Sequence, residues 1–106
     1  MNFGQAVEAL HEGKMIQRYG WNGKNLFVFK QIPSEISIEI VPKMQSLPDN
    51  VKLEFERRHK INPTHTFEAI RYSNQLAIVK PDNSINGWTP SPADSLAEDW
   101  IIYNPS

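Results

Sequence analysis

The segment MIQRYGWNGKNLFVF, residues 15–29, decides how we expect this chain to fold. Two apolar runs, Met15–Tyr19 and Leu26–Phe29, flank the dipeptide Asn22-Gly23. Asn-Gly between β-prone runs is the strongest short-range hairpin signal, because both residues tolerate a positive φ. The segment therefore predicts two antiparallel strands joined by a tight turn.

A short amphipathic helix is predicted before this hairpin. Asn2 can cap it, Gln5 stands three residues further on, and Gly13 follows as a stop. The apolar stripe, at the spacing i, i+4 and i+7, consists of Phe3, Val7 and Leu10.

The stretch Ser34–Leu47 supports two interpretations. Ile36, Ile38 and Ile40 alternate as in a strand, whereas Ile36, Ile40 and Met44 also fit helical spacing. Prolines divide the stretch into short pieces. Its secondary structure therefore stays open at this point.

A second helix is predicted in the central segment, from Asp49 as its N-cap to about Lys60. Val51 and Phe55 fall on its inner face, and Ile61–Thr66 has the polar, proline-containing composition of a loop.

The last third returns to a β pattern that ends in a short helical turn. Strands are predicted at Phe67–Tyr72, Leu76–Val79, near Trp88, and Trp100–Tyr103. Between the last two, Ser91-Pro92-Ala93-Asp94 has the form of a capping box, which predicts a helical turn through Leu96. The expected class is α+β, a small antiparallel sheet with an N-terminal helix and a second helix in the centre.

Length and composition narrow the function. The chain has 106 residues, no cysteine, and 11 basic against 12 acidic side chains. A length of this order fits one domain, with too little core to enclose a large ligand within one subunit. Near-neutral charge argues against binding to duplex nucleic acid or anionic lipid. No apolar run approaches the ~20 residues of a membrane helix, and the N-terminus lacks a secretory pattern.

No catalytic pattern stands out. His11, His59 and His65 lack the spacings that bring two imidazoles to one metal, no serine lies in a nucleophile motif, and the five glycines never cluster into a phosphate loop. The basic pair Arg57 and Arg58 is open to two interpretations, a solvated helix end or a phosphate contact. We therefore expect no metal, no cofactor and no enzyme.

The aromatic residues carry more information. Trp100 and Phe29 are expected in the core, whereas Trp21 and Trp88 adjoin turns, where a ring can offer a face to a flat base. Two acidic residues lie near Trp88 in the sequence and have two interpretations each. Asp94 serves as a local cap and Asp99 as a turn residue, or both bind ribose hydroxyls.

Two blocks of sequence resemble one small phage and prophage domain. The first runs from Met1-Asn2-Phe3-Gly4 to Arg18-Tyr19-Gly20-Trp21-Asn22-Gly23-Lys24, and the second from Trp88-Thr89-Pro90-Ser91 to Leu96-Ala97-Glu98-Asp99-Trp100. In this order they are similar to the Thoeris anti-defence family of the second type. The whole chain, 1–106, then counts as one nucleotide-sequestering domain, and 31–66 resembles an insertion within it.

The resemblance implies a non-catalytic sponge that acts in the cytoplasm of an infected bacterium. Family members bind a cyclic ADP-ribose isomer, the signal of the bacterial Thoeris system, and withhold it from its effector. They are homo-oligomers, commonly tetramers, with ligand held between subunits. Some members also hold cyclic di- or trinucleotides of a related defence system, and the resemblance leaves that activity open for this chain.

The resemblance also implies ligand-binding residues. Base stacking is expected from Trp21 and Trp88, with Phe27 as a weaker third, and a phosphate contact from Arg18. The polar candidates for ribose and base edges are Asn22, Asn74, Ser91, Asp94 and Asp99.

Three other functions compete with the sponge. A phage structural or assembly protein would form oligomers without nucleotide and bury both turn tryptophans in subunit contacts. An enzyme would cleave the nucleotide rather than return it intact. Nucleic-acid binding ranks last, because the charge balance is wrong and no basic stripe is evident.

Overall fold

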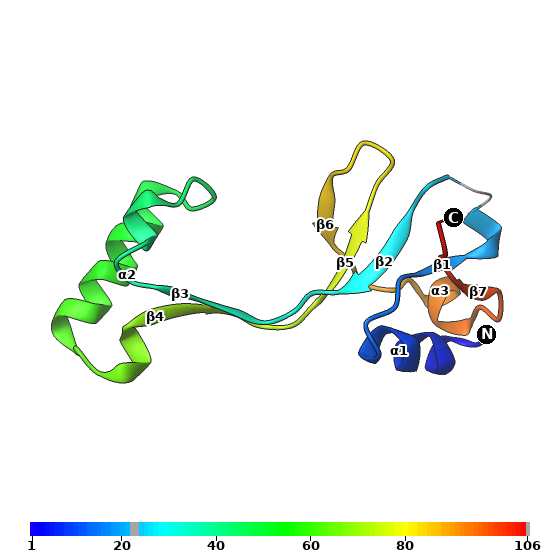
Figure 1. Ribbon diagram of the computed structural model, residues 1–106, viewed down its shortest axis with the longest axis horizontal. Coiled ribbons are helices and arrows are strands. Elements are labelled where there is room, and N and C mark those ends of the chain that lie inside the picture. Colours follow the sequence, from blue (N-terminus) through cyan, green and yellow to red (C-terminus); the bar gives the residue numbers. More distant parts are fainter. Residues whose placement is uncertain (22–23, 106) are drawn as a thin grey trace. The chain divides into compact units, whose positions relative to one another are not determined.

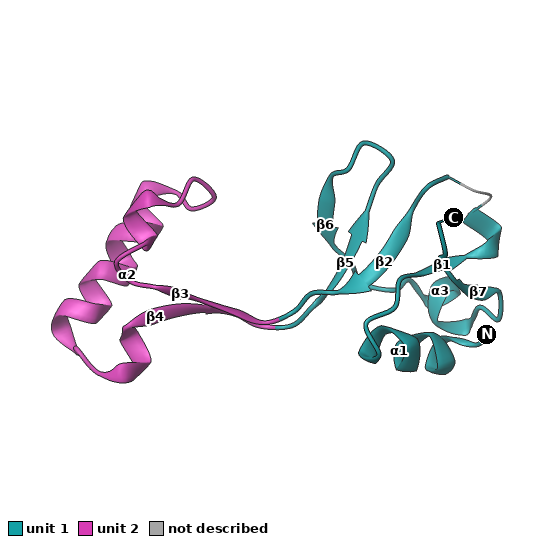
Figure 2. Cartoon of the chain, viewed as in Figure 1, with its two compact units in different colours: residues 1–32, 74–106 teal, residues 33–73 magenta. Residues whose placement is uncertain are grey.

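The computed structural model describes residues 1–21 and 24–105. The chain forms two compact units, shown in different colours in Figure 2. Unit 1 comprises residues 1–32 and 74–106, so it contains both ends of the sequence, and unit 2 comprises residues 33–73. The predicted class, α+β with an N-terminal and a central helix, is confirmed. Whether 31–66 is an insertion stays a prediction.

Unit 1 opens with helix α1, Phe3–His11, which begins and ends as predicted. The Asn2 side chain accepts a hydrogen bond from the backbone N–H of Gln5 at 2.8 Å, and the Gln5 side-chain oxygen in turn accepts one from the Asn2 backbone N–H at 2.9 Å. This reciprocal pair satisfies two of the N–H groups that a helix start leaves unbonded. Gly13 follows with φ +84°, a conformation that glycine adopts without strain.

Among the described residues, unit 1 contains a five-stranded antiparallel sheet in the order β6-β5-β2-β1-β7 (Figure 1). The strands are β1 (Ile16–Arg18), β2 (Phe27–Lys30), β5 (Leu76–Val79), β6 (Ile85–Gly87) and β7 (Trp100–Ile102). Pairing of β1 with β2, in the register Ile16 opposite Val28, confirms the two strands predicted from residues 15–29. The predicted turn Asn22-Gly23 lies outside the described residues.

One expected strand boundary is corrected in this sheet. Strand β1 stops at Arg18, and Tyr19–Trp21 forms a 3₁₀ turn, η1, instead of extending the strand. The Tyr19 backbone N–H donates to the Asp99 carbonyl at 2.9 Å, so its pairing continues toward the C-terminal segment. The strand expected near Trp88 is confirmed as β6, which ends at Gly87.

The core of unit 1 lies between α1 and one face of the sheet. Helix α1 packs against β1, β2 and β7 and also touches α3, Pro92–Leu96. The buried members of this core are Ala6, Ala9, Leu10, Ile16, Val28 and Trp100. The prediction that Trp100 is a core residue is confirmed.

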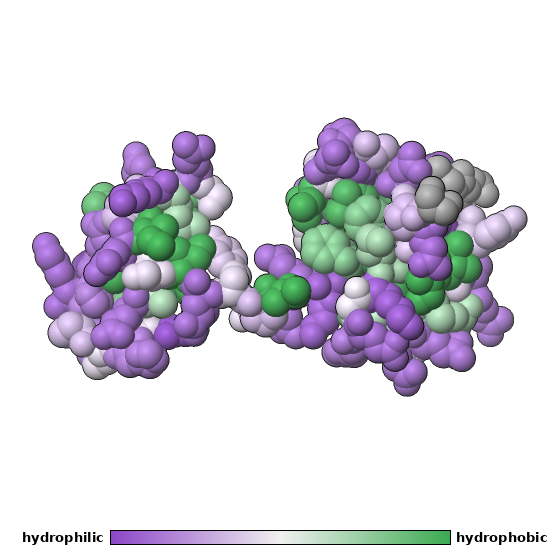
Figure 3. All heavy atoms as spheres, in the orientation of Figure 1, coloured by the Kyte–Doolittle hydropathy of each residue, from purple (hydrophilic) through white to green (hydrophobic). Residues whose placement is uncertain are grey.

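The opposite face of the sheet is apolar as well. Because side chains alternate along a strand, Phe27 and Phe29 point away from the face that carries Val28. The register sets Phe27 opposite Val79, and Val79 opposite Ile85. We call Phe27, Phe29, Val79 and Ile85 the outer sheet face; Figure 3 shows apolar side chains gathered over β2, β5 and β6. Phe29 is half-buried here, so its assignment to the main core was wrong.

Unit 2 consists of a two-stranded antiparallel sheet and a helix. Strand β3 (Ser34–Ser37) pairs with β4 (Ala69–Tyr72), and helix α2 spans Asp49–Ile61. Short 3₁₀ turns occur at Val41–Lys43 (η2) and His65–Phe67 (η3). The open stretch 34–47 therefore begins as a strand, because β4 supplies its hydrogen-bonding partner.

Several central boundaries differ from the prediction. Pro48, not Asp49, is the N-cap of α2, because the Pro48 carbonyl accepts from the N–H groups of Val51 and Lys52, both at 3.1 Å. The turn η3 falls partly within the predicted loop, and it delays the start of β4 to Ala69.

None of the helices formed by the described residues is long and apolar enough to span a membrane.

Candidate functional site

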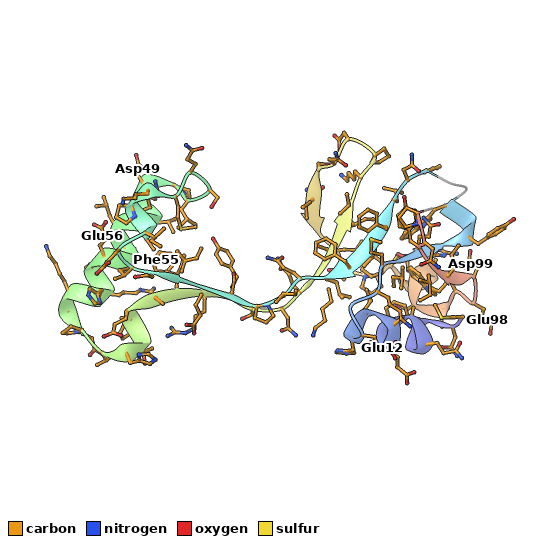
Figure 4. All side chains as sticks on the ribbon, viewed as in Figure 1. Glu12, Asp49, Phe55, Glu56, Glu98 and Asp99 are labelled. Carbon is orange, nitrogen blue, oxygen red and sulfur yellow. The ribbon has the colours of Figure 1, made fainter. Side chains whose placement is uncertain are left out.

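The two blocks of sequence at the ends of the chain meet around Arg18. Its Nε donates to Asp99 Oδ1 at 2.9 Å, and its Nη1 donates to Asp94 Oδ1 at 3.0 Å. Asp94 lies on α3 and Asp99, labelled in Figure 4, lies just before β7. The three side chains are partly shielded from solvent, with exposed fractions of 24, 15 and 33% for Arg18, Asp94 and Asp99. One guanidinium therefore links β1 to two C-terminal segments.

Backbone groups occupy the second oxygen of each carboxylate. Asp99 Oδ2 accepts from the Gly20 N–H at 2.9 Å, and Asp94 Oδ2 accepts from the Ser91 N–H at 3.0 Å. The Ser91 hydroxyl in turn accepts from the Asp94 N–H at 3.0 Å, so the predicted capping box of α3 is confirmed. We call Arg18, Asp94 and Asp99 the ion-pair cluster.

Gly20 leaves room for this arrangement. A Cβ atom at that position would stand 2.9 Å from Asp99 Oδ2, closer than Cβ atoms come in folded proteins. Any larger residue would displace the carboxylate that the Gly20 N–H binds.

The ion-pair cluster keeps its groups charged. Hydrogen bonds from Arg18 and from the Gly20 N–H lower the pKa of Asp99 below its ordinary 3.8. Burial raises the pKa of Asp94, but its hydrogen bonds to Ser91 and Arg18 outweigh burial and leave the pKa lowered. The same bonds, first to Asp99 and then to Asp94, raise the pKa of Arg18. Two carboxylates against one guanidinium leave the cluster with one net negative charge.

Three tryptophans lie next to the ion-pair cluster. The indole Nε1 of buried Trp100 donates to the Asp94 carbonyl at 3.0 Å. Trp21 and Trp88, both half-buried, meet the Trp100 ring at near-perpendicular angles, with centroid distances of 5.5 and 5.9 Å. Phe3 contacts Trp88 and Trp100. The two tryptophans predicted to stack on a base thus share one buried neighbour.

The structure separates the other candidate residues from this group. Phe27 belongs to the outer sheet face and stacks on Tyr103, with ring centroids 5.2 Å apart and planes within 7°. Asn74 lines a cavity of about 250 Å³ with Lys30 and His11. Asn22 lies outside the described residues.

In unit 2, several side chains considered as functional candidates instead contact residues close to them in the sequence. Arg57 pairs with Glu54 one helical turn away, with Nε 2.8 Å from Oε2, and this bond lowers the pKa of exposed Glu54 to about 2. His59 contacts the Phe67 carbonyl, and His65 contacts Glu68. Across residues 1–21 and 24–105, no cluster of three or more histidine or acidic side chains could hold a metal.

The sequence did not reveal the contacts that three residues make. Trp100 was assigned only to the core, and neither Gly20 nor Tyr103 was a candidate. For Gly20 and Trp100 the available signal is the Gly-Trp pair at residues 20–21 and the Asp-Trp pair at residues 99–100, because each pair sets a small or charged group beside an indole.

The fold and this site define a small α+β domain whose N- and C-terminal segments build one aromatic and charged cluster. The chain belongs to the family of Thoeris anti-defense 2-like domains, whose model matches residues 1–103. It is 34% identical over 104 residues to Thoeris anti-defense 2 of Bacillus phage SP01, covering 98% of this chain and 96% of that protein. Its role is therefore phage anti-defence against the Thoeris system.

Proposed function

We propose that this protein is a sponge that binds and sequesters the cyclic ADP-ribose-type signal of the Thoeris system without cleaving it. Family membership supports the anti-defence role. The observation that carries the nucleotide-binding part is the grouping of Trp21 and Trp88 around Trp100, beside the ion-pair cluster. The protein acts in the cytoplasm of the infected bacterium, where the signal is produced.

The half-buried indoles of Trp21 and Trp88 suit adenine recognition. Their contacts with Trp100 restrict ring motion before ligand arrives, which lowers the entropy lost on binding. Stacking of a base on an aromatic side chain contributes ~1–3 kcal/mol in nucleic-acid systems. Sequestration needs this kind of affinity and requires no nucleophile, metal or acid-base pair.

The ligand is held between subunits of a homo-oligomer, which we expect to be a tetramer. A domain of this size has little volume for a nucleotide within one subunit. The outer sheet face offers an apolar contact surface, with Ile85 62% exposed and no charged residue among its members. Phe27, predicted as a weaker ligand contact, lies on that face, so in this proposal it approaches ligand where two subunits adjoin.

The same apolar face would also serve a phage assembly protein that binds only other proteins. The two functions differ in their ligand, since only the sponge removes nucleotide from solution. They also differ at Trp21 and Trp88, which the assembly protein would bury against another subunit.

A depletion experiment tests the proposal. Purified protein is mixed with the Thoeris cyclic ADP-ribose signal, removed by filtration and then heat-denatured, and both fractions are analysed by chromatography. We expect loss of the signal from the filtrate and recovery of intact signal from the protein. Altered products would identify an enzyme, and an undepleted filtrate would reject the sponge. Cyclic di- and trinucleotides are tested in parallel as a second ligand class.

Variants assign the stacking residues. Trp21→Ala and Trp88→Ala should each weaken binding tenfold or more, because ~1.4 kcal/mol corresponds to tenfold. Leu53→Ala is the matched control, since it removes a large apolar side chain that is 64% exposed on α2. Unchanged affinity in both tryptophan variants, with the fold intact, would reject the stacking assignment.

A further inference from the structure

Arg18 is the basic residue of the first sequence block that we expected to bind a phosphate. In the structure its Nε and Nη1 donate to Asp99 and Asp94, at 2.9 and 3.0 Å. A guanidinium is planar, and its N–H groups have a fixed geometry, so using two of them in this way constrains the direction of the remaining ones. The side chain is therefore already bound to partners within its own chain.

The charge around Arg18 also disfavours a phosphate. Two carboxylates surround one guanidinium, which leaves one net negative charge in a partly shielded environment. A phosphate bound to Arg18 would lie close to the carboxylates of Asp94 and Asp99 as well, and like charges repel at such distances. The cluster attracts an anion less than an unpaired arginine would.

The covalent chain connects this cluster to the aromatic residues. Arg18 and Gly20, both hydrogen-bonded to Asp99, stand three residues and one residue before Trp21, and Asp99 immediately precedes Trp100. On the other side, the Asp94 carbonyl accepts from the indole of Trp100 at 3.0 Å. A shift of Arg18 or Asp99 would therefore reach an indole within three residues of the chain.

We infer that Arg18 is a positioning residue, which bridges Asp94 and Asp99 so that Trp21 and Trp88 are held on Trp100 in the geometry that receives a base. It makes no contact with ligand phosphate. This inference rests on the proposed function for its ligand, and it assigns the ion-pair cluster a role in recognition by Trp21 and Trp88.

Three substitutions separate this role from a phosphate contact. Arg18→Gln removes the charge and the bridge. Arg18→Lys keeps the charge, but a single ammonium cannot reproduce the planar two-carboxylate bridge, whereas it is a good phosphate ligand. Asp99→Asn removes one anchor and leaves the Arg18 guanidinium more available to an anion. Lys80→Gln is the matched control, because it removes one exposed positive charge from the same unit.

Each variant is measured for affinity toward the Thoeris cyclic ADP-ribose signal at several salt concentrations, and for near-ultraviolet circular dichroism without ligand. We expect all three site variants to bind at least tenfold more weakly and to show altered tryptophan bands. The slope of log Kd against log salt should match that of the unsubstituted protein. The double variant Arg18→Gln/Asp99→Asn should bind the signal no more weakly than the weaker-binding of the two single variants, because both changes break the same ion-pair cluster. Lys80→Gln should leave the affinity and the tryptophan bands unchanged.

Other outcomes overturn the inference. Near-normal affinity in Arg18→Lys, with a reduced salt slope in Arg18→Gln, would identify a direct phosphate contact. Lower thermal stability with unchanged affinity and unchanged tryptophan bands would show that the ion-pair cluster contributes to stability and not to the position of the indoles. Should the unsubstituted protein bind no signal, the proposed function fails, and the tryptophan bands of Asp99→Asn and Arg18→Lys still decide whether the cluster positions the indoles.

Discussion

Replacement of Trp100 by alanine should remove a large part of the stability of unit 1. The Trp100 side chain is fully buried, contacts the rings of Phe3, Trp21 and Trp88, and donates one hydrogen bond to the Asp94 carbonyl. Truncation of a buried Trp or Phe to Ala costs about 3–5 kcal/mol, through lost burial and the cavity that remains. A domain of this size has a total unfolding free energy of roughly 5–15 kcal/mol.

The assay follows tryptophan fluorescence during urea and thermal unfolding. All three tryptophans of the chain belong to unit 1, so the signal reports on that unit alone, and Trp21 and Trp88 remain as reporters in the variant. At about 4–8 °C per kcal/mol, Trp100→Ala should lower the melting temperature by at least ~12 °C. Trp100→Phe keeps an aromatic ring and should lose only about 1–2 kcal/mol.

Leu53→Ala serves as the control, since its exposed side chain predicts a change within about 0.5 kcal/mol. A loss below about 1 kcal/mol in Trp100→Ala would refute the reasoning, because it would mean that the three-tryptophan cluster is not the centre of this core.

Three further predictions concern local interactions. Asn2→Ala removes the capping side chain of α1 and should cost about 1 kcal/mol, measured as a lower urea midpoint with an unchanged slope. The lowered pKa values of Asp94 and Asp99 mean that their contribution to stability is present above their ordinary value of 3.8 and is lost as the pH falls through their lower folded-state values. The unfolding free energy should therefore fall in acid, and the fall should be smaller in Asp94→Asn and Asp99→Asn; identical pH profiles would contradict this. Glu54→Gln should leave the unfolding free energy essentially unchanged although the pKa of Glu54 is lowered to about 2, because solvent screens the exposed Glu54–Arg57 pair.

Local structure in this protein follows from interactions between residues close in the sequence. The capping boxes at Asn2 and Ser91 are built from groups three residues apart, so the sequence pattern was sufficient to predict both helix starts. The same holds for the stop at Gly13. The strands around residues 15–29 were predicted from two β-prone runs that flank an Asn-Gly turn signal, which are local properties.

Long-range pairing explains what the sequence left open. Residues 34–37 became a strand because β4, more than thirty residues away, pairs with them, and no local pattern distinguishes that outcome from a helix. The placement of Phe29 depended on which face of the sheet α1 covers. The side chain of its neighbour Val28 lies on the face that α1 covers, so the side chain of Phe29 lies on the opposite face.

The sequence by itself determined the class of fold, both capped helices, the family resemblance and the residues that deserve testing. It could not determine that Arg18 pairs with Asp94 and Asp99, or that Trp21 and Trp88 share one buried ring. Those contacts join groups separated by up to 81 positions along the chain. Only the sheet order, which sets β7 beside β1, brings them within bonding distance, because charge and aromatic character in a sequence specify what a side chain can bind and not which partner it meets.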